Sequence, residues 1–109
     1  MSPRKQAMAL AFGAALRESR MEVGFSQEQL ALTAGIDRTY ASLLERGLRT
    51  PTLTVLLLLA DTLGVSAALL VQRTLSYVEQ SRAASEVGRP RMAVARDDAA
   101  VRSLERKAR

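Results

Sequence analysis

The 109-residue chain contains neither cysteine nor histidine. Without cysteine there can be no disulfide bonds, zinc–thiolate sites or cysteine nucleophiles, a composition compatible with a reducing cytoplasm. Without histidine the chain lacks the commonest general base and the commonest metal ligand. The sequence also shows no nucleophile–base pair, metal-ligand cluster or glycine-rich phosphate loop. We therefore expect no enzyme activity, no metal and no cofactor.

The sequence is also poor in aromatic residues and in long apolar runs. Aromatic residues make up 4% of the chain and tryptophan is absent, whereas apolar residues make up 48%. A core built from Leu, Ala and Val favours packed helices over sheets. The run Leu53–Leu59 is far shorter than the roughly 18 residues of a membrane span. The alanine-rich N-terminal region is interrupted by Gly13 and Arg17 and lacks a secretory core. We expect a cytoplasmic protein that does not contact a membrane.

Positive charge is concentrated near the C-terminal end of a chain whose net charge is +5. Residues 1–70 carry seven basic and six acidic side chains, and residues 71–86 are neutral. Residues 87–109 carry seven basic and three acidic side chains, which gives a net charge of +4. Such a segment is typical of polyanion binding but also of a solvated tail. Composition alone leaves both interpretations open.

Caps and helix breakers predict an all-α fold of five helices, over residues 6–23, 26–34, 37–46, 52–63 and 66–85. Ser26 and Gln29 have the spacing of a capping box, and Asp37 is a favourable N-cap. Gly24 and Gly35 are placed to end the first two helices. The apolar residues with roughly helical spacing in the first helix are Leu10, Ala14, Leu16 and Met21.

The same caps and breakers predict three parts of the chain. Residues 6–70 are expected to form a helical bundle, residues 71–86 to extend its last helix, and residues 87–109 to form a basic tail. The break between the last two parts lies at Gly88 and Pro90. Within the tail, a short helix from Asp97 and a disordered segment are both compatible with the sequence.

The segment from Ala31 to Pro51 carries the functional signal. Two short helices are joined by a tight turn, in which Ala31 allows close packing and Gly35 allows the backbone to turn sharply. This is the pattern of a helix-turn-helix, whose second helix lies in the major groove of DNA.

Residues 10–70 resemble the lambda-repressor/Cro-like family, also called the xenobiotic-response-element type. The matching segments are Leu16–Arg20, Gly24–Ala31, Ala34–Ile36, Glu45–Gly47, Pro51–Leu53 and Ala60–Val65. The resemblance implies a five-helix bundle that binds operator DNA as a two-fold dimer. Here residues 6–70 would form the DNA-binding bundle, and the extended C-terminal helix over residues 71–86 would serve dimerisation.

The resemblance also implies a role for individual residues. Those expected to contact bases are Arg38, Thr39, Ser42 and Leu43. Those expected to contact phosphate are Gln27, Tyr40, Arg46 and Arg49. Arg20 and Glu45 match a buried or half-buried salt bridge that would hold the first helix against the recognition helix.

Two positions depart from the family pattern. Leu43 replaces a side chain that is often polar and base-reading, so it either touches a thymine methyl group or only packs. Leu58 replaces a residue that is usually charged, and with Val55 and Thr62 it forms an apolar stripe on the fourth helix. The opposite face, expected to fill the core, carries Leu53, Leu56, Leu57, Ala60 and Leu63. A helix that is apolar nearly all round is buried on more than one side. The residues expected in a dimer interface are Val55, Leu58, Leu75 and Val78.

These features predict a sequence-specific, double-stranded DNA-binding transcription regulator. We expect a repressor or autoregulator that binds a palindromic operator as a homodimer. The first alternative is a protein-interaction or antitoxin-like module that uses the same fold without reading DNA. An enzyme is the second alternative, and no motif in the sequence favours it.

Overall fold

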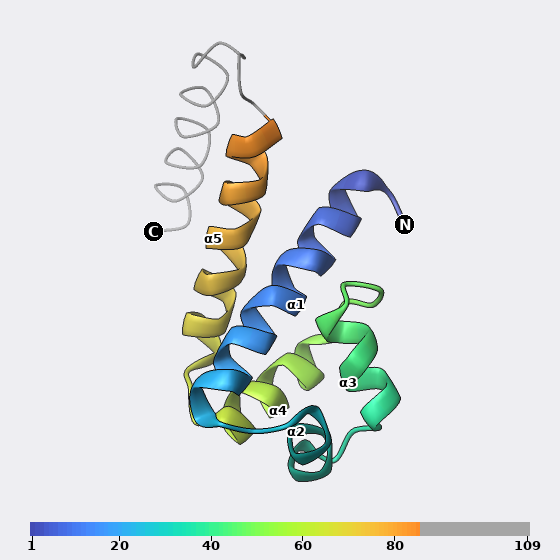
Figure 1. Ribbon diagram of the computed structural model, residues 1–109, viewed down its shortest axis with the longest axis vertical. Helices are drawn as coiled ribbons and strands as arrows, with labels where there is room; N and C mark the ends of the chain where they lie inside the picture. The colour runs from blue at the N-terminus through green and yellow to red at the C-terminus, as the bar shows by residue number, and fades with distance from the viewer. Residues whose placement is uncertain (86–109) are drawn as a thin grey trace, which may run out of the picture.

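The computed structural model describes residues 1–85, which form five helices (Figure 1). They are α1 (Pro3–Val23), α2 (Gln27–Ala34), α3 (Arg38–Glu45), α4 (Leu53–Leu63) and α5 (Ala67–Ser85). The described part of the chain contains no strand, so the predicted all-α class is confirmed. The predictions made for the tail, residues 87–109, lie outside the described residues.

Helix α1 begins at Pro3, three residues before the predicted start. The Ser2 hydroxyl accepts a hydrogen bond from the backbone N–H of Lys5 at 3.2 Å and so caps the helix. Proline suits the first turn of a helix because its missing N–H would have no intrahelical partner there. The Ser-Pro pair was the signal that the sequence analysis passed over. The predicted end at Gly24 is confirmed.

The helix-turn-helix forms from local signals that the structure bears out. Gln29 N–H donates to the Ser26 hydroxyl at 3.0 Å, and Ser26 N–H donates to the Gln29 side chain at 2.8 Å, which completes the capping box. Gly35 ends α2 with φ of +74°, a conformation that other residues adopt at a cost. Asp37 then caps α3 by accepting from Thr39 N–H at 2.7 Å.

Every helix contributes to one apolar core. Its buried members are Phe12, Ala15, Leu16, Leu30, Leu44, Leu59, Ala60, Leu63 and Leu70. Of the apolar positions noted in the first helix, only Leu16 belongs to this core, and Leu10 and Met21 are exposed. The inward face of α1 is instead built from Phe12, Ala15 and small neighbours. Spacing alone could not choose between these faces, because both are apolar.

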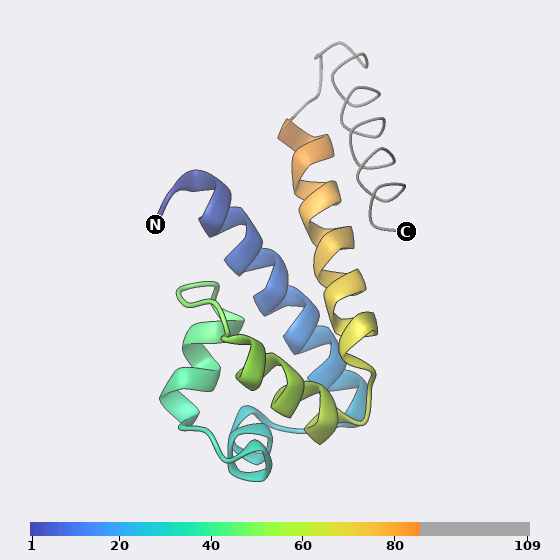
Figure 2. The same cartoon turned by 180° about the vertical axis from the view of Figure 1, so that it is seen from behind.

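Helices α1 and α5 are the most extensively packed pair, and they run in opposite directions (Figure 1). Helix α4 lies behind α1 in that view and in front of it when the molecule is seen from behind (Figure 2). Helix α2 packs on α3 and α4, and α3 also packs on α1. The five helices thus form one bundle that presents α3 at its edge.

Helix α4 differs from its predicted orientation. Leu53 and Leu57 were expected to fill the core, but they are 70% and 50% exposed. The buried side consists of Leu59, Ala60 and Leu63. Since the helix is apolar nearly all round, its sequence does not determine which leucines face inward.

Within residues 1–85, no single helix is both long and apolar enough to cross a membrane. Helices α4 and α5 pass that test only when they are taken together, and they meet at an angle of 107°.

Candidate nucleic-acid interface

The first turn of α3 and the first turn of α2 form one surface. Arg38 and Thr39 are exposed at the start of α3, and Ser42 lies one turn further along the helix. Together with Gln27, the first residue of α2, they line a shallow pocket of about 220 Å³. The structure therefore brings together four residues that the sequence analysis assigned to DNA contact. A hydrogen-bonding surface on a protruding helix can reach the base edges in a major groove.

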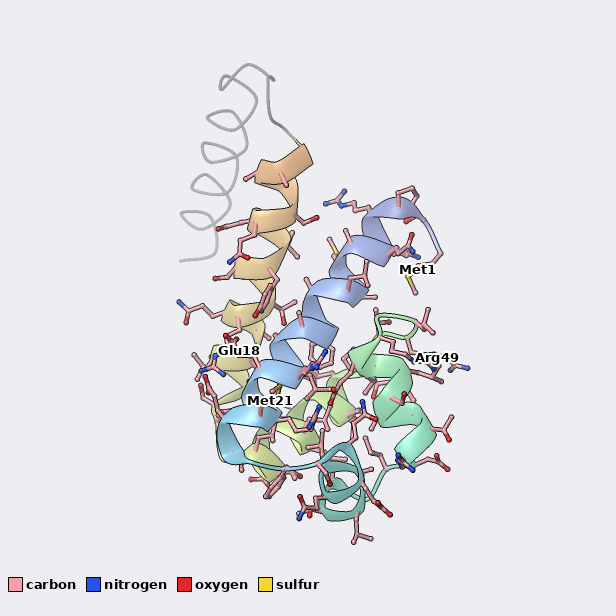
Figure 3. All side chains as sticks on the ribbon, viewed as in Figure 1. Met1, Glu18, Met21 and Arg49 are labelled. Carbon is pink, nitrogen blue, oxygen red and sulfur yellow. The ribbon has the colours of Figure 1, made fainter. Side chains whose placement is uncertain are left out.

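The other four residues assigned to DNA contact do not line this pocket. Tyr40 packs against the core, and Leu43 is half-buried. Arg46 follows the last residue of α3, and Arg49 lies in the loop before α4, where both are exposed. Figure 3 shows the Arg49 side chain at the edge of the molecule, beyond the α3 ribbon. The two arginines could reach the backbone of a duplex that lies along α3.

A hydrogen-bonded network fixes α3 to α1 and α2. The Arg20 guanidinium contacts both carboxylate oxygens of Glu45, with Nε–Oε2 at 2.6 Å and Nη2–Oε1 at 2.9 Å. Its Nη1 donates to the carbonyl of Phe25 at 2.8 Å. Gln27 Nε2 donates to Glu45 Oε1 at 3.2 Å. One carboxylate at the end of the recognition helix thus orients both an α1 cation and the Gln27 amide.

This network is shielded from water. The side chains of Arg20 and Glu45 are 14% and 4% exposed. Hydrogen bonding to Glu45 raises the pKa of Arg20 against the opposing effect of burial, and the charge of Glu45 raises it further. An arginine with a raised pKa contributes full stability below its ordinary pKa and loses it only as the pH rises through the raised value. The arginine side of this pair is therefore insensitive to pH throughout the range in which proteins work.

Within residues 1–85, the exposed cations around α3 have no ion-pair partner. Of the nine Lys and Arg side chains in residues 1–85, only Arg20 and Arg73 form ion pairs. Arg38, Arg46 and Arg49 therefore remain available to a polyanion. The same part of the chain holds no group of three or more side chains suited to a metal ion.

Sequence reasoning missed the contact that sets the distance between α1 and α3. A Cβ atom added to Gly13 would lie 2.5 Å from the Glu45 carbonyl oxygen and 2.6 Å from that of Leu44. The helices can approach this closely only because position 13 has no side chain. The available signal was a glycine inside a helical pattern, which often marks a packing constraint.

The residues expected in a dimer interface lie on two helices. Leu58 on α4 and Leu75 on α5 are 44% and 55% exposed. Val78 is partly buried, and Val55 packs against the protein's own core. Other exposed apolar side chains on these helices are Leu53, Leu57 and Val71. The apolar surface open to a partner therefore includes leucines that the sequence analysis had placed inside.

Comparison with known proteins decides the family. The model of the family described as Helix-turn-helix matches residues 16–70, half of the chain. The chain belongs to the lambda-repressor/Cro-like helix-turn-helix family. Its members are DNA-binding transcription regulators. All eight residues assigned to DNA contact lie in the matched region of this regulator, whereas Leu75 and Val78 lie beyond it.

Two relatives carry the same description. The regulator is 46% identical over 55 residues to the HTH-type transcriptional regulator y4dJ of Sinorhizobium fredii. This match covers 50% of the chain and 71% of y4dJ. The regulator is also 39% identical over 49 residues to the HTH-type transcriptional regulator YqaF of Bacillus subtilis, and this match covers 45% of the chain and 64% of YqaF. Each of these similarities covers about half of the regulator.

Solved structures extend the similarity to three dimensions. The clp gene regulator ClgR of Corynebacterium glutamicum superposes with a TM-score of 0.70 at 28% identity, over 75% of this chain and 87% of ClgR. The restriction-modification controller protein C.AhdI of Aeromonas hydrophila superposes with a TM-score of 0.56 at 42% identity, over 57% of this chain and 94% of C.AhdI. The regulator therefore shares the fold of other helix-turn-helix regulators.

Proposed function

We propose that this regulator binds a palindromic operator as a homodimer and represses or autoregulates a nearby operon. The observation that carries the proposal is the cluster of Gln27, Arg38, Thr39 and Ser42 at the exposed edge of the bundle. The proposal is further supported by the structural similarity to ClgR, a clp gene regulator, and to C.AhdI, a restriction-modification controller protein. Selection of bound duplexes from a random pool tests it directly, because a specific dimer enriches an inverted repeat.

The proposed interface makes two kinds of contact with DNA, one to phosphates and one to bases. Gln27, at the N-terminus of α2, lies beside free backbone N–H groups that favour phosphate. Arg38 lies in the first turn of α3, the part of a recognition helix that reaches base edges. Its guanidinium has the geometry to bond O6 and N7 of one guanine together. Arg46 and Arg49 add charge contacts to the backbone, and Thr39 and Ser42 add hydrogen bonds to bases.

Replacing Arg38 or Gln27 by alanine distinguishes contacts to bases from contacts to phosphates. We expect Arg38→Ala to weaken operator binding by about tenfold or more, since a bidentate arginine–guanine pair contributes roughly 1–3 kcal/mol of discrimination. Binding to scrambled duplex should change little. Gln27→Ala should instead weaken both duplexes by similar factors, because phosphate carries no sequence information. Titration of both duplexes at several salt concentrations provides the measurement.

The salt series adds a control. Because Gln27 is neutral, Gln27→Ala should leave the slope of log K against log salt concentration unchanged. Arg46→Ala should reduce the magnitude of this slope by about one unit per site. An equal loss on operator and scrambled duplex would show that Arg38 contacts only the backbone. If no duplex shifts with salt at all, the protein-interaction module becomes the better description.

A homodimer through α4 and α5 would pair the recognition helices. The exposed apolar side chains on these helices exceed what an isolated bundle needs, and such surfaces mark interaction sites. A two-fold axis there would place the two copies of α3 about 34 Å apart, one turn of duplex. Leu58 and Leu75 are its expected central residues, and Val55 and Val78 its partly buried margin.

A charge at Leu58 should therefore break the dimer. We expect the wild type to sediment as a dimer at micromolar concentration and Leu58→Asp as a monomer, because an aspartate buried at an apolar interface has no partner. Leu32→Asp is the matched control, since Leu32 is 82% exposed on α2 and should leave the oligomeric state unchanged. A wild type that is monomeric at this concentration contradicts the proposal.

A further inference from the structure

Arg73 on α5 contacts three side chains of α1. Its Nη1 donates to the Ser19 hydroxyl at 2.9 Å, and its Nη2 donates to Glu22 Oε1 at 3.2 Å. Nη1 also lies 2.9 Å from Glu22 Oε2, and Nε lies 3.8 Å from Glu18 Oε2. Ser19 is fully buried and donates in turn to the Ala15 carbonyl at 2.9 Å. Arg73 thus anchors α5 to a buried polar group and to the surface of α1 at once.

The same turn of α1 holds the recognition helix. Ser19 and Glu22 contact Arg73, while Arg20, between them in sequence, forms the paired contact with Glu45 at the end of α3. Residues 18–22 therefore connect α5 to one side of α1 and α3 to another. The position of α3 relative to α5 depends on both connections.

Arg73 lies near the base of α5, where a small rotation has a large effect. The other contacts of α5 with the core come from Leu70, which is fully buried, and from Ala67 and Tyr77, which pack against the core. Beyond this base, the N-terminal half of α1 and the C-terminal half of α5 separate, as both ribbon views show (Figures 1 and 2). Leu75 and Val78, the α5 residues expected in the dimer interface, follow Arg73 by two and five residues, so a change in how Arg73 holds the helix acts directly on them.

We propose that Arg73 is a positioning residue that sets the spacing of the two DNA half-sites that the dimer recognises. The inference rests on the proposed function, in which α4 and α5 form the dimer interface around Leu58 and Leu75. In such a dimer the angle between α5 and α1 sets the separation and rotation of the two α3 helices. One base pair added between the half-sites rotates one half-site relative to the other by about a tenth of a helical turn. A dimer in which α5 is held rigidly therefore binds one spacing better than the neighbouring spacings.

Arginine suits this role better than lysine. Its planar fork reaches the Ser19 hydroxyl and the Glu22 carboxylate at the same time, whereas a lysine presents one compact charge on a flexible stem. Removing the fork leaves the apolar contacts of Leu70 and Tyr77 in place. The expected consequence is a dimer that still forms but holds its two recognition helices less firmly.

The test uses duplexes in which the central spacer of the selected operator is changed by −2 to +2 base pairs. Wild type should prefer the original spacing. Arg73→Met should reduce the discrimination between that spacing and its neighbours by about fivefold, which corresponds to about 1 kcal/mol. Arg73→Lys should be intermediate, and the control Arg82→Met should match wild type, because Arg82 is exposed on α5 and forms no ion pair within residues 1–85.

Thermal melts show whether each variant folds, and sedimentation shows whether it still forms a dimer. If Arg73→Met does not fold, Glu22→Gln provides the test, because it removes the charged partner of Arg73 and leaves the Ser19 contact. Glu22→Gln should reduce the dependence of affinity on spacer length, the spacing profile, to a smaller degree. A folded Arg73→Met or Glu22→Gln with the wild-type profile overturns the inference and leaves the proposed dimer intact. A wild type that is monomeric and indifferent to spacing overturns the proposed function and this inference with it.

Discussion

Replacing Glu45 by glutamine should lower the free energy of unfolding by about 3 kcal/mol, because it leaves Arg20 charged and largely buried without a counter-charge. The carboxylate is 4% exposed and accepts three hydrogen bonds, two from Arg20 and one from Gln27. Glutamine keeps the shape but presents an N–H group to one of these donors. Urea unfolding, followed by circular dichroism, measures the change.

An exposed carboxylate on α1 provides the matched control. Glu18 lies 3.8 Å from Arg73 and its side chain is 42% exposed. Glu18→Gln should change stability by less than about 0.5 kcal/mol, as is usual for exposed ion pairs. A change of that small size for Glu45→Gln would show that the Arg20 pair contributes no more than a surface pair.

The loss of Glu45 should also affect DNA binding without changing specificity. Glu45 orients the Gln27 amide through the hydrogen bond from Nε2. At a temperature where Glu45→Gln remains folded, operator and scrambled duplex should weaken by the same factor. A selective loss on the operator would instead indicate that α3 itself has shifted.

Replacing Gly13 by alanine should destabilise the fold by about 1–2 kcal/mol, although the same change in an open helix would stabilise it. Alanine is favoured over glycine inside a helix by about 1 kcal/mol. Here the new methyl group would meet two backbone carbonyl oxygens of α3, at 2.5 and 2.6 Å. Backbone cannot move aside as a flexible side chain can, so α1 and α3 must separate, and overpacking of this kind costs roughly 1–3 kcal/mol or more.

Thermal unfolding provides the measurement, since each 1 kcal/mol shifts the melting temperature of a domain this size by about 4–8 °C. The control is Ala14→Gly at the next position, which removes a methyl group from a half-buried site and should cost about the propensity difference alone. A Gly13→Ala variant that melts at or above the wild-type temperature would contradict the close approach of the two helices.

Local signals were sufficient for most of the secondary structure. The capping box of Ser26 and Gln29, the Asp37 cap and the glycines that end α1 and α2 were all predicted, because each acts on a backbone group within a few residues. Family membership was predicted for the same reason, since the helix-turn-helix pattern is continuous in sequence. The assignments of Arg38 and Gln27 to DNA contact remain predictions.

Tertiary structure decided what local patterns could not. Helix α4 is apolar nearly all round, so packing against α1, α2 and α5 determined that Leu53 and Leu57 are exposed while Leu59 is buried. The contact of Arg73 with Ser19 joins residues 54 positions apart, and no helical periodicity predicts such a pair. Position 13 requires glycine only because the end of α3 lies against it. The sequence by itself determined where helices begin and end, since that depends on neighbouring backbone groups. The fold decided which faces meet, because that depends on how all five helices share one core.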